Sequence, residues 1–181
     1  MNNNLEDYEW NIEDKEVIKN IFIHVIYTYI MAFIEYGFTH CNLYYNNVLL
    51  YDNVLLYNNE NNNNFIYKIY TYIIPIPIKK FKIRLLNCKK IKLDYDFNQL
   101  YKDLKISFLD NICNHNIFNK IFDTNKLSLL SDKFNYLLHK YNNEFDKNKE
   151  TSIKYAILLL EIIKIGTSHQ YDNIIDIINS L

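Results

Sequence analysis

The chain has 181 residues, of which 49% are hydrophobic and 23% charged, and its formal net charge is −1. This length suits one domain with a sizeable core, and the apolar fraction excludes a wholly disordered chain. The near-zero charge argues against a dedicated nucleic-acid binder, because no basic excess is available to displace counterions from phosphates. Arg84 is the only arginine, so bidentate phosphate contacts are nearly absent as well.

Asparagine is strongly over-represented, with 28 Asn against two Ala and two Gly. Residues with A/T-rich codons are frequent and those with G/C-rich codons are rare. This bias indicates an AT-rich genome, such as that of a large DNA virus, a protist or a reduced bacterium. Many of the asparagines then reflect mutational drift, so a single Asn carries little functional information.

Cysteine usage and the N-terminal sequence bear on the compartment. Cys41, Cys88 and Cys113 form no CxxC pair, so neither a zinc site nor a disulfide framework is indicated. The polar, acidic N-terminus has no signal-peptide core. The longest apolar stretch, 21–34, is shorter than the roughly 20 residues that span a bilayer. We therefore expect an intracellular protein that spans no membrane.

The first elements in chain order are a polar segment and a buried helix. Residues 1–14 are expected to be a polar lead-in with one aromatic anchor, Trp10. The pattern of residues 15–36 predicts a helix that is apolar on more than one face, which is typical of the centre of a domain. Gly37 follows as a good terminator, because glycine accepts the left-handed conformation at a helix end.

A β-rich insert comes next. The tract 58–64 is low in complexity and is expected to be an exposed loop. Pro75 and Pro77 make the end of the strand after it an edge or extended segment. Residues 48–57 are expected to form two short strands around a tight turn at Asp52-Asn53. The other expected strand segments are 65–78, 81–86 and 90–94.

From about residue 98 the chain is expected to be helical. The clearest helix is 151–165, which has an amphipathic pattern, and Gly166 is expected to close it. A last short helix is expected over 171–181. The sequence thus predicts a mainly α fold with a small β-rich insert, in which residues 15–181 form one domain.

One segment carries a recognisable pattern. Residues 37–50 read GFTHCNLYYNNVLL, and this segment resembles the catalytic loop of protein kinases, H-R-D-L-x-x-x-N followed by an apolar strand. His40, Leu43 and Asn47 match at the right spacing. The buried helix expected before the loop and the strand 48–50 after it fit the same family. The residues 37–40 (GFTH), which are not followed by an arginine, are similar to the start of this loop in viral and small-molecule kinases that lack the arginine.

The resemblance implies a phosphotransferase that uses ATP and Mg²⁺. His40, Asn42 and Asn47 take its catalytic positions: Asn42 would orient a substrate hydroxyl, and Asn47 would hold Mg²⁺ and nucleotide. The family's second Mg²⁺ ligand comes from a D-F-G turn. The turn beginning at Asp94 (sequence DYD) resembles a viral variant of it, so Asp94 is the favoured ligand of Mg²⁺ and nucleotide. A rival register starts the turn at Asn87 (sequence NCK) and leaves no carboxylate there.

A buried aspartate that caps the backbone of the catalytic loop is a further feature of the family. Asp123, at the start of a helical run, resembles this structural residue, although an ordinary helix N-cap is an equally good interpretation.

Three departures from the family matter. Asn42 stands where the catalytic Asp is expected, and Cys41 replaces the arginine. Residues 1–14 cannot supply an N-lobe, and Gly37 and Gly166, the only glycines, form no phosphate-binding loop. The resemblance therefore implies a kinase-like C-terminal lobe (C-lobe) without an N-terminal lobe.

Two classes of function follow. The first is a truncated or degenerate protein kinase, which transfers phosphate to protein Ser/Thr if active and otherwise serves as a pseudokinase binding module. Its partner would be a protein substrate or a partner kinase, in the host cytoplasm if the protein is viral. The alternative is a non-enzymatic helical interaction protein of an AT-rich virus or parasite.

Overall fold

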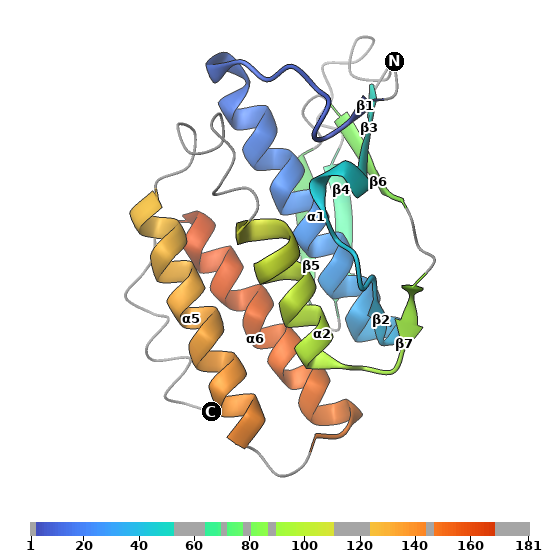
Figure 1. The fold of residues 1–181 in the computed structure, drawn as a ribbon, viewed down its shortest axis with the longest axis vertical. Helices are drawn as coiled ribbons and strands as arrows, with labels where there is room; N and C mark the ends of the chain where they lie inside the picture. Colours follow the sequence, from blue (N-terminus) through green and yellow to red (C-terminus); the bar gives the residue numbers. More distant parts are fainter. Residues whose placement is uncertain are drawn as a thin grey trace.

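A computed structural model describes residues 3–52, 64–69, 72–77, 81–86, 90–110, 124–143 and 147–168. They form a mainly helical structure with a small antiparallel strand component, as the sequence predicts (Figure 1). The helices are η1 (Ile12–Asp14), α1 (Lys15–Tyr36), η2 (Tyr45–Asn47), α2 (Phe97–Tyr101), the π-helix η5 (Lys102–Leu109), α5 (Thr124–Asn143) and α6 (Lys149–Ser168). The strands are β1 (Asn3–Asn4), β2 (Phe38–Thr39), β3 (Val48–Asp52), β4 (Asn64–Ile69), β5 (Tyr72–Pro77), β6 (Phe81–Leu85) and β7 (Lys92–Leu93).

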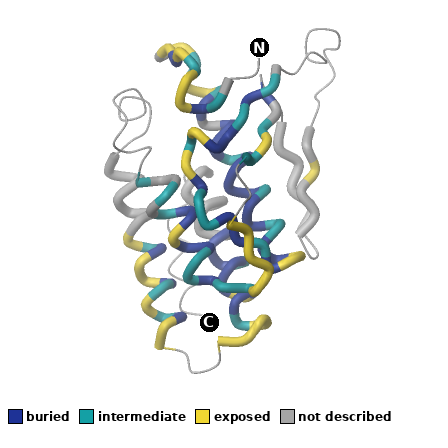
Figure 2. Tube along the Cα trace, turned by 45° about the vertical axis from the view of Figure 1, so that its right-hand side comes forward, coloured by how far each residue is buried: buried dark blue, intermediate teal, exposed yellow. Residues whose placement is uncertain are grey.

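Helix α1 lies at the centre of the core and has the bounds that the sequence predicts. It contacts α6 on one side and β4 and β6 on the other, so it needs apolar residues nearly all round. Figure 2 shows the buried positions gathered along this helix. The buried apolar residues of α1 are Ile18, Ile21, Phe22, Val25, Ile26, Tyr27, Tyr29, Ile30, Phe33 and Ile34.

Gly37 ends α1 as predicted. Its φ of 68° is left-handed, and its N–H donates to the carbonyl of Phe33 at 2.7 Å. A Cβ at this position would come within 2.7 Å of the Tyr95 ring and 2.8 Å of the Tyr95 backbone nitrogen. Glycine is therefore required here both by the conformation and by the close approach of Tyr95.

The strands form three small antiparallel sheets, with the orders β1-β3-β6, β2-β7 and β4-β5. Strand β1 belongs to the segment that the sequence predicts as a polar lead-in, so part of that lead-in pairs with β3. The predicted aromatic anchor is confirmed, because Trp10 is buried and its indole N–H donates to the carbonyl of Leu5 at 3.1 Å. Leu5 is itself buried, and its N–H donates to the carbonyl of Val48 at 2.8 Å.

The two prolines lie in β5, as predicted for an edge segment. Pro75 pairs with Ile66 and Pro77 with Asn64. Proline has no N–H, so both must occupy positions whose N–H would point away from β4. The outer edge of this hairpin therefore lacks two donors and is a poor template for another strand.

Some expectations differ from the structure. Helix α6 continues through Gly166 to Ser168, because an isolated glycine lowers helix stability by only about 1 kcal/mol and does not by itself end a helix. Of the expected strand 90–94, only Lys92–Leu93 is paired, since β2 offers a ladder of two residues. The second strand expected before residue 58 and the helix expected over 171–181 lie outside the described residues. Of the tract 58–64 expected as an exposed loop, residues 58–63 also lie outside them, whereas Asn64 already belongs to β4.

Helix α1 is also long and apolar enough to cross a membrane by length and composition. The helix runs from Lys15 to Tyr36 and so extends beyond both ends of the apolar stretch 21–34, which by itself is too short to span a bilayer. However, 71% of its most apolar window is buried inside the fold. A core helix of a globular domain passes the same test by length and composition.

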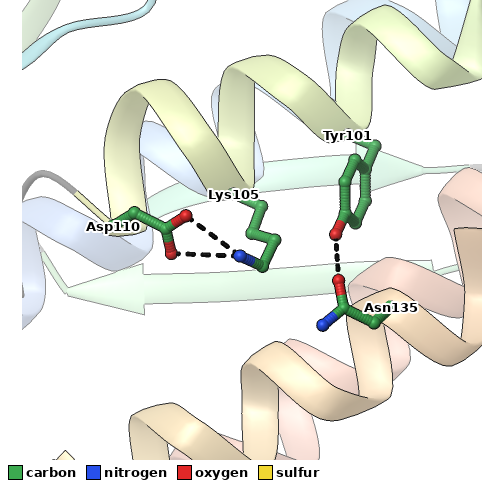
Figure 3. A network of polar contacts seen from close by, with 4 residues as sticks. All are labelled: Tyr101, Lys105, Asp110 and Asn135. Carbon is green, nitrogen blue, oxygen red and sulfur yellow. Dashed lines mark hydrogen bonds and ion pairs between the residues drawn. The ribbon is translucent and has the colours of Figure 1, made fainter.

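One hydrogen bond joins the segment α2–η5 to α5, and an ion pair lies within the segment (Figure 3). The Tyr101 hydroxyl donates to the amide oxygen of Asn135. Four residues after Tyr101, the Lys105 ammonium pairs with the Asp110 carboxylate, at 2.9 Å to Oδ2 and 3.3 Å to Oδ1. Burial, and secondly the negative charge of Asp110, raise the pKa of the Tyr101 phenol above its ordinary value.

Replacing Gly37 tests the helix end. We expect Gly37→Ala to lower the free energy of unfolding by about 1–3 kcal/mol, because it adds left-handed strain and a contact with Tyr95. Chemical denaturation measures the change. The matched control is Gly166→Ala inside α6, where helix propensity predicts a gain of about 0.8–1 kcal/mol. Equal effects at both positions would contradict this account of Gly37.

The Tyr101 phenol reports on the Asp110 charge. We expect Asp110→Asn to lower the Tyr101 pKa towards its ordinary value, because the negative charge beside the phenol is removed. Lys105→Met should raise it further, since Asp110 then lacks its counter-charge. NMR titration of ¹³C-labelled tyrosine rings measures both shifts, and shifts of the same sign would show that Asp110 does not act on Tyr101.

Candidate functional site

The candidate site is the loop between β2 and β3, residues 40–47, which carries the kinase-like pattern. Its first end is fixed by the imidazole of His40, which is fully buried. The Nε2 atom lies 2.7 Å from the carbonyl oxygen of Leu86, directly after β6. A carbonyl only accepts hydrogen bonds, so Nε2 carries the hydrogen in this contact.

The second end of the loop is fixed at the same residue. Asn47 lies in η2 and is buried, and its backbone carbonyl accepts from the N–H of Leu86 at 2.8 Å. Its side-chain Nδ2 donates to the backbone carbonyl of Asn42 at 2.8 Å, which closes the loop on itself. Leu86 therefore holds both ends, accepting from His40 and donating to Asn47.

A buried carboxylate, Asp103, supports the loop from beneath. It lies in η5 and is only 1% exposed. Its Oδ2 accepts from the backbone N–H of Cys41 at 2.8 Å and from the hydroxyl of Tyr29. Its Oδ1 accepts from the side-chain amide of Gln99 at 3.1 Å. Donors from α1, α2 and the loop thus converge on one carboxylate, which makes its burial tolerable.

Tyr29 connects α1 to the loop. Its hydroxyl donates to Asp103 and accepts from the backbone N–H of His40 at 2.8 Å. Burial, and secondly the Asp103 charge, raise the pKa of this phenol well above its usual value. Tyr29 therefore remains protonated and keeps its role as a donor at any ordinary pH.

The loop contains one left-handed residue other than glycine. Cys41 has a φ of 59°, which costs an L-residue roughly 1–2 kcal/mol. The hydrogen bond from its N–H to the Asp103 carboxylate is worth about 1.5–3 kcal/mol, so it offsets this strain. The conformation at Cys41 is therefore maintained by the carboxylate beneath it.

Asp94 is not brought to Asn47 by the strand pairing. In the β2–β7 ladder Phe38 pairs with Leu93 and Thr39 with Lys92, so Asp94 lies at the Gly37 end of β2 and His40 at the other. The exposed Asp94 carboxylate accepts from the N–H of Asp96 at 3.3 Å. Leu86 does contact Asn47, and its successor in the chain is Asn87, the start of the rival turn.

The DYD sequence acts as a turn that starts a helix. The Asp96 side chain accepts from the N–H of Gln99 at 3.1 Å and is the N-cap of α2. Tyr95 has a φ of 55°, and its hydroxyl donates to the carbonyl of Glu35 at 3.1 Å. The ammonium of Lys149 lies 4.6 Å from the centre of the same ring. These contacts join the end of α1 to the starts of α2 and α6.

The capping aspartate of the loop is a residue that the sequence argument missed. Asp123, expected in this role, lies outside the described residues, and Asp103 occupies the position beneath the loop. A signal was present, because Asp103 falls between Leu100 and Leu104 on a buried helix face. A carboxylate on such a face is almost never buried without hydrogen-bond partners.

The chemistry available to the loop is limited by its side chains. Asn42, half-buried, has an amide where a base would need a carboxylate, and an amide cannot accept a proton at neutral pH. Within the residues that the structure describes, no group of three or more His, Cys, Asp or Glu is placed to hold a metal ion.

Comparison with known proteins adds no assignment. No protein-family model, curated protein or solved structure matches the chain. The roles of the loop residues are therefore argued from the contacts above.

Removing the Tyr29 hydroxyl tests the support of the loop. We expect Tyr29→Phe to lower the free energy of unfolding by about 1–3 kcal/mol, because Asp103 loses a donor and the His40 N–H its acceptor. The pH dependence should change as well. A phenol with a raised pKa in the folded state contributes stability that is complete below the unfolded-state pKa of about 10 and lost as pH rises above it.

The wild-type protein should therefore lose stability above about pH 10 more steeply than Tyr29→Phe. Denaturation at a series of pH values measures both slopes. Tyr136→Phe is the control, since Tyr136 is 46% exposed. If Tyr29→Phe and Tyr136→Phe gave the same slope, the buried pair of Tyr29 and Asp103 would not control the alkaline stability.

Proposed function

We propose that the chain is a kinase-like C-lobe that acts as a non-catalytic binding module, that is, a pseudokinase. The observation that carries this proposal is the support of residues 40–47 by a buried carboxylate. In the kinase family, a buried aspartate caps the backbone of the catalytic loop. Here Asp103 accepts from the N–H of Cys41, directly after His40.

The element order supports the same proposal. A buried helix, α1, leads through β2 into the loop, and the loop leads into β3, as in the kinase-like pattern. His40 and Asn47 match that pattern, and both are buried and bound to Leu86. These contacts support the comparison of the loop with the family's catalytic loop.

Two features argue against phosphoryl transfer. Asn42 cannot act as a general base, and loss of such a group lowers the rate by roughly 10²–10⁴. Asp94 is not paired beside Asn47, so the Mg²⁺ site of an active kinase lacks its second carboxylate there. An active phosphotransferase with ATP and Mg²⁺ is therefore the weaker candidate.

As a binding module, the chain would present its rigid loop to a protein partner, either a true kinase or the substrate of one. The AT-rich composition suits a virus and a cellular parasite equally. If the source is a virus, we expect the protein in the host cytoplasm.

A measurement of ATP binding tests the proposal that the chain is not catalytic. We expect no Mg²⁺-dependent rise in melting temperature with ATP. A nucleotide at 100 times its Kd would stabilise the fold by about 2.7 kcal/mol and raise the melting temperature by roughly 5–10 °C. Asn42→Asp should also transfer no γ-phosphate, because the second metal ligand is still missing. A Mg²⁺-dependent shift in the wild type would instead support the enzyme.

The kinase-like loop itself is tested separately, by hydrogen exchange of the Cys41 amide. Asp103→Asn should speed this exchange, because the acceptor beneath the loop loses its charge, whereas Asp132→Asn at an exposed position of α5 should not. An unprotected Cys41 amide in the wild type would remove the basis of the proposal and leave a helical interaction protein as the alternative.

A further inference from the structure

The segment that carries Asp103 is a π-helix. Helix η5 follows α2 directly, and at its end the N–H of Asp110 donates to the carbonyl of Lys105, five residues earlier. Hydrogen bonds of this spacing define a π-helix, which is rare in proteins and mostly limited to a single turn. The eight residues of η5 therefore need specific contacts that favour the π register over the α register.

One ion pair has the spacing of the π register. Lys105 and Asp110 are five residues apart, and the ammonium lies 2.9 Å from Oδ2 and 3.3 Å from Oδ1 of the carboxylate. In an α-helix, residues five apart lie about 140° apart around the axis, and side chains pair at spacings of three or four. In a π-helix the backbone hydrogen bond itself joins residues five apart. The α register would therefore break this ion pair.

The register of η5 also sets the place of the Asp103 carboxylate. The hydrogen bond between Tyr101 and Asn135 ties the end of α2 to α5, and Asp103 lies two residues beyond Tyr101. A π-helix turns less per residue than an α-helix, so Asp103 is rotated by roughly 30–40° from the position that a continued α-helix would give it. Hydrogen bonds weaken steeply when their geometry is distorted. The 2.8 Å contact from the Cys41 N–H to Asp103 therefore depends on the π register.

We propose that the ion pair of Lys105 and Asp110 holds η5 in the π register and thereby keeps Asp103 beneath residues 40–47. Both are positioning residues for the loop, on which they act through Asp103. The hydrogen bonds of a helix form cooperatively, so a weakened last turn weakens the turns before it. This inference concerns the support of the loop, and it stands whether or not the loop is kinase-like.

NMR scalar couplings across backbone hydrogen bonds measure the register directly. In the wild type we expect the amide nitrogen of Asp110 to couple to the carbonyl carbon of Lys105. In Lys105→Met a coupling to the carbonyl carbon of Ile106 should replace it, because the α register is favoured once the ion pair is lost. The Cys41 amide should then exchange about threefold or more faster relative to the amides of α1, which is the scale of a partly exposed ion pair.

Two further variants separate the ion pair from other effects of the substitution. The charge swap Lys105→Asp/Asp110→Lys should restore both the coupling across five residues and the slow exchange of the Cys41 amide. Lys102→Met is the matched control, because Lys102 is exposed at the start of the same helix, and it should change neither measurement.

The proposal is overturned if Asp110 of the wild type couples to Ile106, or if the charge swap restores neither measurement. It is also overturned if Lys105→Met speeds the exchange of Cys41 only as much as that of α1, since a general loss of stability would do the same. If Asp103→Asn speeds the Cys41 exchange and Lys105→Met does not, this inference fails alone and the proposed function is unaffected.

Discussion

The local architecture around the loop depends on the burial of one carboxylate. Asp103 is almost fully enclosed, and an enclosed carboxylate is tolerated only when donors satisfy it. Three donors do so, from Tyr29 in α1, Cys41 in the loop and Gln99 in α2. If any of these elements moved away, it would leave a polar group unsatisfied, at a cost of about 1–3 kcal/mol. The carboxylate therefore couples elements that are far apart in the sequence.

A second contact completes this arrangement at the end of β6. Leu86 joins His40 to Asn47 through its carbonyl and its N–H, so the loop is closed by backbone groups. The pairing of β3 with β6, from Val48 with Leu85 to Asp52 with Phe81, brings Leu86 to this place. The register of this one strand pair thus determines whether the loop can close at all.

The fold was largely predictable from local patterns, whereas the site was predictable only in part. Helix α1 and its end at Gly37 follow from apolar periodicity and the chemistry of glycine, and the spacing of His40 and Asn47 marks the loop. Their attachment to Leu86 depends on strand register, which residue spacing does not specify. Asp103 was missed because its partners are brought to it only by the packing of three elements. Gly166 misled the prediction, because a helix-breaking tendency of about 1 kcal/mol is easily overridden.

The same contacts explain why this loop is unsuited to switching between two arrangements. A switch needs an element with two arrangements of similar free energy, which a ligand or a modification can bias. Here the loop is attached at both ends to Leu86 and supported by Asp103, whose hydrogen bond offsets the strain at Cys41. Because a second arrangement would break several buried hydrogen bonds at once, the loop is held in one conformation. If a protein partner binds it as proposed, that partner need not supply the free energy to order it.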